Sequence, residues 1–98
     1  MPLETAELLT LPGGDLVAAG LQDLALGVES RESLLVASFA ARLRRLGVEV
    51  PAHEIAEPEH RLYSLLARAG EDSAHRRYNA SVRRLVSFTR ALASLTHA

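Results

Sequence analysis

Arginines recur through the C-terminal third of the chain at a spacing that could bind phosphate. Arg76, Arg83 and Arg90 are seven residues apart, and Arg77 and Arg84 follow the first two. Seven residues are close to two turns of an α-helix, so a helix here places the guanidinium groups along one side. Guanidinium groups bind phosphates and carboxylates through paired N–H donors. The pattern predicts a nucleic-acid-binding or phosphate-binding face, with a solvated helix face or pairing with acidic residues as the alternatives.

A second candidate for anion binding lies at the start of the same region. Between Asp72 and Asn79, a histidine and two arginines fall within the first two turns of the expected helix, where free N–H groups attract negative charge. Asp72 is also an N-cap candidate, and its carboxylate would occupy the same N–H groups. The candidate ligand-binding or nucleic-acid-binding residues are therefore His75, Arg76, Arg77, Arg83, Arg84 and Arg90.

Histidines near carboxylates offer the other possible chemistry. The run from His53 to His60 resembles the zincin motif, but Glu57 replaces the second histidine of that motif and a proline interrupts the helix it needs. Glu57 with His60, and Asp72 with His75, have the three-residue spacing of di-iron ligands, but both pairs lie at expected helix starts. We therefore predict no metal site and no cofactor, and we infer no catalytic residues and no catalytic activity; a nuclease or metal-dependent enzyme is the third alternative.

Length and composition predict a single all-α domain. The chain has 98 residues, which suits one domain with a small core. Leu and Ala account for 34 residues, and Val, Ile and Thr for only 12, a bias that favours helices. There is no cysteine, which excludes disulfides and thiolate chemistry. Without a long apolar run or a basic leader, we expect a cytoplasmic protein that does not enter a membrane.

Glycines, prolines and capping residues divide this domain into helices. Asp15 and Ser30 are expected N-caps, and Gly27 and Gly47 are expected to end helices in a left-handed conformation. Apolar residues repeat between these signals at alternating three- and four-residue spacings. A small bundle of about five helices is expected within residues 1–98, over residues 3–11, 16–26, 31–46, 58–69 and 73–95.

The last expected helix is long for a domain of this size. About 23 residues would extend roughly 35 Å, whereas a compact domain of 100 residues has a radius of gyration of about 13 Å. Part of its apolar face would lack a partner within one chain, and a second copy could cover it. We therefore predict a homodimer. The expected core and dimer residues are Leu35, Phe39, Leu43, Leu46, Tyr78, Val82, Leu85, Phe88 and Leu92.

Charge is unevenly distributed along a chain whose formal net charge is −1. The first thirty residues carry five acids and no arginine, whereas residues 71–98 carry five arginines and two acids. All 11 cations are arginine, which the codon composition of a GC-rich genome also explains. The primary hypothesis is a homodimer or adaptor that acts through protein–protein contacts. The alternative is binding of nucleic acid or a phosphate ligand, which requires that acids leave the arginine face uncovered.

Overall fold

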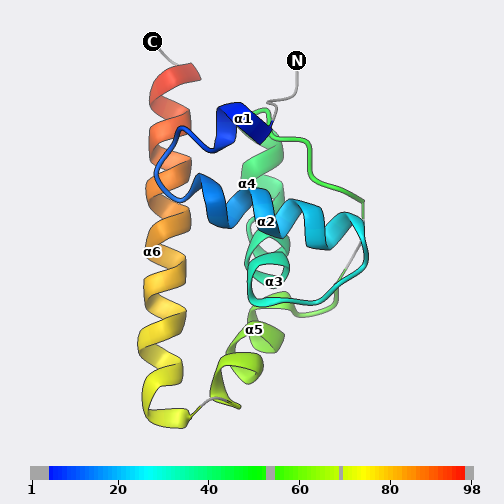
Figure 1. The fold of residues 1–98 in the computed structure, drawn as a ribbon, viewed down its shortest axis with the longest axis vertical. Coiled ribbons are helices and arrows are strands. Elements are labelled where there is room, and N and C mark those ends of the chain that lie inside the picture. The colour runs from blue at the N-terminus through cyan, green and yellow to red at the C-terminus, as the bar shows by residue number, and fades with distance from the viewer. Residues whose placement is uncertain (1–4, 53–54, 69, 97–98) are drawn as a thin grey trace.

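The computed structural model describes residues 5–52, 55–68 and 70–96, and within these ranges the chain forms six α-helices and no strand (Figure 1). The predicted all-helical class is confirmed. The helices are α1 (Thr5–Leu8), α2 (Gly14–Ala25), α3 (Arg31–Ser38), α4 (Ala40–Arg45), α5 (Pro58–Ala67) and α6 (Glu71–Thr96).

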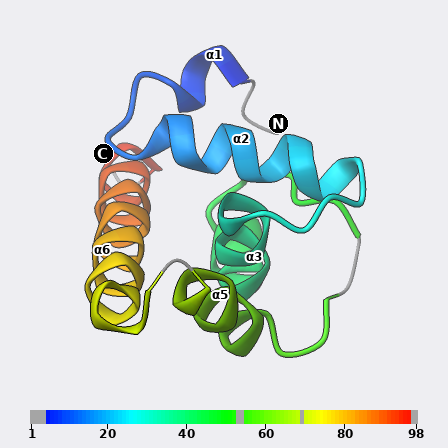
Figure 2. The ribbon, with the colours of Figure 1, turned by 60° about the horizontal axis from the view of Figure 1, so that its bottom comes forward.

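The helix α6 runs the full length of the molecule. Its 26 residues at about 1.5 Å each give roughly 39 Å, and the longest dimension of the molecule is 41 Å. The helix α2 begins beside α6 and crosses over α3, and α5 packs against both α3 and α6 (Figures 1 and 2). The core therefore lies between α6 on one side and α3 on the other, with α2 and α5 closing it.

The apolar stripe of α6 is covered within a single chain along most of its length. Its buried large side chains, Leu85, Phe88 and Leu92, are at most 1% exposed, whereas Leu95 in the last turn is 64% exposed. The predicted homodimer rested on an uncovered apolar face of α6. Among the large apolar residues of this stripe, only Leu95 is left exposed. Of the expected core and dimer residues, five are buried (Leu35, Leu43, Leu85, Phe88 and Leu92) and four are half-buried against them (Phe39, Leu46, Tyr78 and Val82).

The range 31–46, expected as one helix, is divided into α3 and α4 at Phe39. The Ser38 hydroxyl donates to the Leu35 carbonyl at 2.7 Å, a bond that competes with the helical ladder and bends helices. The Phe39 N–H is shared between the carbonyls of Leu35 and Val36, at 3.3 and 3.1 Å. Such shared bonds are common at helix ends. The chain continues directly into α4, so the two helices form a bent rod.

Local signals set the end of α2 and the start of α3. Ser30 is its N-cap: the Ser30 hydroxyl accepts from the Ser33 N–H at 3.1 Å, and the Ser33 hydroxyl accepts from the Ser30 N–H at 2.7 Å. This reciprocal pair is a capping box. Gly27, with φ of 73°, ends α2, and the Val28 N–H donates to the Asp23 carbonyl at 2.8 Å. That bond is the long-range bond of a Schellman motif.

Gly20 allows α2 to lie close to α3. A Cβ atom at this position would be 2.5 Å from the Glu32 carbonyl oxygen and 2.5 Å from Val36 Cγ2. A backbone oxygen in a packed helix cannot move away as a flexible side chain can. The crossing of α2 and α3, which positions everything that follows, therefore requires a residue without a side chain here.

The substitution Gly20→Ala is expected to destabilise the protein by about 1–3 kcal/mol through overpacking at this crossing. In an open helix the same change would stabilise by about 1 kcal/mol through helix propensity, so the sign is diagnostic. Ala19→Gly at the neighbouring exposed position is the control and should cost about 1 kcal/mol. Urea unfolding followed by circular dichroism measures both, and an unchanged or raised stability of Gly20→Ala would contradict the close approach.

Candidate anion-binding surface

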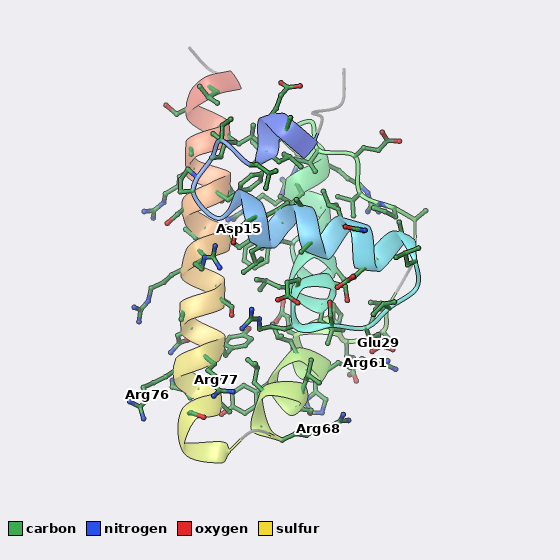
Figure 3. All side chains as sticks on the ribbon, viewed as in Figure 1. Asp15, Glu29, Arg61, Arg68, Arg76 and Arg77 are labelled. Atoms are coloured by element: carbon green, nitrogen blue, oxygen red, sulfur yellow. The ribbon has the colours of Figure 1, made fainter. Side chains whose placement is uncertain are left out.

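The arginines of α6 lie on the side of the helix that is turned away from the core. Arg83 and Arg90 each precede a buried leucine, Leu85 and Leu92, by two residues. Two residues correspond to about 200° around an α-helix, so these arginines point outward because the leucines point inward. Arg76, Arg83 and Arg90 are all exposed, and together they form the arginine ridge. In Figure 3, Arg76 and Arg77 project from α6 in different directions.

Arg84 has a different environment because it faces α2. Its Nη2 atom donates to Asp15 Oδ1 at 2.5 Å. Asp15 was expected to be the N-cap of α2, but Gly13 precedes the helix instead and Asp15 lies in the first turn. The hydrogen bond from Arg84 is the main cause that lowers the pKa of the Asp15 carboxyl. Arg84 is therefore neutralised by the acidic N-terminal part of the chain.

Other acids of the N-terminal third are also engaged away from the ridge. Arg61 of α5 donates to both carboxylate oxygens of Glu29 at 2.8 and 2.9 Å (Figure 3). Asp23 accepts a hydrogen bond from the Ser30 hydroxyl at 2.7 Å. Within the described residues, no ion pair to a carboxylate is formed by Arg83 or Arg90. The acids thus cover Arg84 and leave these two ridge arginines open.

At the start of α6, the structure shows one side-chain contact among the residues of the expected anion site. His75 Nε2 lies 3.2 Å from Asn79 Nδ2 on the same helix, and both His75 and Arg77 are exposed. Arg76 follows Asp72 by four residues, a spacing at which acid–base pairs form on helices. The side chain of Asp72, the expected cap, lies outside the described part of the structure. Arg83 and Arg90 are therefore the ridge arginines for which the described residues show no carboxylate partner.

A cleft between α4 and α6 adds two arginines that were not among the sequence candidates. It is an open depression of about 400 Å³. Arg42 and Arg45 of α4 and Arg90 of α6 line it. The Arg42 guanidinium carbon lies 5.9 Å from the centre of the Phe39 ring, a cation–π distance. The remaining lining residues of this α4–α6 cleft are Leu46, Thr89 and Ala93.

Metal-binding chemistry has no visible basis in the described residues. Nowhere in them do three or more His, Asp or Glu side chains gather as metal ligands would. His53 of the zincin-like run lies outside the described residues, and His60 lines a pocket with Arg61 and Arg68. None of the described helices combines the length and the apolar character needed to cross a membrane.

The Asp15–Arg84 pair gives a pH dependence with a definite sign. Because the pKa of Asp15 is lowered in the folded protein, the pair stabilises the fold above the unfolded pKa of Asp15 and ceases to do so as the pH falls through its folded pKa. In Arg84→Gln, we expect the Asp15 pKa to rise toward its ordinary value. Carboxyl carbon shifts followed by NMR during acid titration measure this, and an identical Asp15 pKa in both proteins would refute the pairing in solution.

The comparisons with known proteins add no functional information to this surface. Neither protein-family models, nor curated proteins, nor solved structures contain a match to the chain. The arrangement of the arginines themselves is therefore the basis on which a function is proposed.

Proposed function

We propose that this protein binds nucleic acid through the phosphate backbone, using the arginine ridge of α6 and the neighbouring arginines of α4. The observation that carries the proposal is the contrast between two adjacent residues of α6. Arg84 is paired with Asp15, whereas Arg83 is exposed and forms no ion pair with a described carboxylate. Guanidinium groups that remain open along one side of a rigid helix are suited to a repeating polyanion. We further propose that the protein acts in the cytoplasm.

The aromatic side chains indicate that such binding would read phosphate and not bases. Tyr63 and Tyr78 contact each other edge-to-face, with ring centres 5.9 Å apart. Phe39 lies beneath Arg42, and Phe88 is buried in the core. A stacking platform requires exposed aromatic faces along the strand path, and the ridge supplies cations instead. We therefore expect weak dependence on base sequence and strong dependence on salt.

Binding of short oligonucleotides measured by fluorescence anisotropy tests the proposal. For a mixed-sequence single strand, contacts to three or four phosphates predict a slope of log K against log salt of about −2 to −3. Strands of different sequence should give similar slopes. No binding at low salt, or binding that does not weaken as salt is added, would contradict the proposed function.

The adjacent arginines of α6 provide matched variants for the same assay. Arg83→Gln is expected to weaken binding by about threefold to tenfold at low salt and to reduce the salt slope by roughly one contact. Arg84→Gln removes the same formal charge from a residue already paired with Asp15. The double variant Asp15→Asn with Arg84→Gln removes both charges of that pair and should bind like the wild type. Equal losses in Arg83→Gln and the double variant would rule out the ridge as the binding surface.

The homodimer or adaptor role predicted from the sequence stays a prediction. Leu95 is the exposed large apolar residue that continues the stripe of α6, and it offers little area for a second copy. Light scattering over a concentration series tests the homodimer. A strict monomer at the highest concentration would contradict it and would leave the proposed binding of nucleic acid unaffected.

A further inference from the structure

We infer that the α4–α6 cleft is a binding site for a phosphomonoester, the dianionic phosphate found at the end of a nucleic acid strand or on a free nucleotide. The inference rests on the proposed function where the phosphate belongs to a strand. The cleft is distinct from the arginine ridge, because two of its three arginines, Arg42 and Arg45, belong to α4.

Among the described residues, the charges that line the cleft are all of one sign. Arg42, Arg45 and Arg90 share this space of about 400 Å³, and no carboxylate of the described part of the chain is among its lining residues. Cations near the last turn of α4 oppose the negative end of its dipole, but that end amounts to only about half a charge. Three guanidinium groups exceed it, so the cleft keeps a net positive potential that an anion would neutralise.

The arginines of α4 differ in what their side chains already contact. Arg44 donates to the backbone carbonyls of Val50 and Pro51, at 3.3 and 3.4 Å, and lies outside this cleft. Arg42 is supported by the Phe39 ring, which leaves its N–H donors available for a ligand. Arg45 is exposed and lines the cleft. Arg44 therefore holds the segment that follows α4, whereas Arg42 and Arg45 have N–H donors available in the cleft.

The three positive charges of the cleft favour an anion with two negative charges over an anion with one. A phosphodiester or a carboxylate carries one negative charge, whereas a phosphomonoester carries about 1.5 to 2 at neutral pH and has three terminal oxygens. Three guanidinium groups with planar, paired donors match a group with three oxygens and about two charges. The side chains of Leu46 and Ala93 add an apolar surface against which a sugar or base can lie.

The position of the cleft relates it to the ridge. Arg90 belongs to both, and Arg83 lies seven residues earlier, roughly 10 Å along α6. A strand that follows Arg83 toward the C-terminus of α6 therefore reaches the cleft at Arg90. The two additional arginines at that point suit the end of a strand, where the phosphate carries its extra charge.

Three versions of one oligonucleotide test the strand end, with the fluorophore attached to an internal base. They carry a 5′-phosphate, a 3′-phosphate or no terminal phosphate. We expect one phosphorylated version to bind about fivefold tighter than the unphosphorylated one, the gain typical of one additional exposed ion-pair cluster. Arg45→Gln should abolish this preference, whereas Arg44→Gln, the adjacent variant with the same change in charge, should retain it.

Isothermal titration with AMP, with adenosine as the control, tests the cleft independently of any strand. Binding of AMP but not adenosine, lost in Arg45→Gln and kept in Arg44→Gln, supports the cleft with a free nucleotide as the source, even if no strand binds and the proposed function fails. A strand preference without measurable AMP binding supports the strand end as the source. Equal affinity for all three strands together with no AMP binding would overturn the inference.

Discussion

The burial of one face of α6 determines how this helix is oriented and which of its side chains face solvent. Leu85, Phe88 and Leu92 are almost completely buried, and burying each such side chain contributes roughly 1.5–3 kcal/mol. Turning the helix by one residue position would expose these side chains and move arginines toward the core, where unpaired charge is strongly unfavourable. The core therefore fixes the rotation of α6. The outward direction of Arg83 and Arg90 is a consequence of that packing.

Charge pairing between distant parts of the chain then sorts the arginines into two groups. Asp15 of α2 neutralises Arg84, and Glu29 in the turn before α3 neutralises Arg61. Both pairs are exposed, so each adds little to stability. Their effect is on the surface potential, because each pair cancels one positive charge: that of Arg84 where α6 faces α2, and that of Arg61 on α5. The positive charge that remains open includes Arg83 and Arg90 of the ridge and continues into the α4–α6 cleft.

Features that depend on local sequence were predictable, and features that depend on packing were not. The helical class, the Ser30 cap and the outward direction of Arg83 follow from residue spacing and capping chemistry alone. The pairing of Asp15 with Arg84 joins residues 69 positions apart, so it depends on the contact between the start of α2 and α6. Sequence spacing gives no measure of such a contact.

The same holds for the candidate site: its arginines are visible in the sequence, but their approach to one another is not. The arginines at the end of α4 are visible in the sequence, where their position near a helix C-terminus already accounts for them. Their approach to Arg90 arises from how the bent rod of α3 and α4 lies beside α6, and the bend at Phe39 has no clear signal in the apolar pattern. The cleft therefore emerged only from the tertiary arrangement.

The most direct measurement is an NMR titration of the wild-type protein with a short single strand, observing the Nε–Hε groups of all arginines. Each arginine reports separately, so the experiment locates the contact surface without any substitution. We expect the signals of Arg83, Arg90 and Arg45 to shift together at low salt and those of Arg61 and Arg84 to stay in place. Shifts centred on Arg61 and Arg84, or no shifts at any arginine, would refute binding at the arginine ridge.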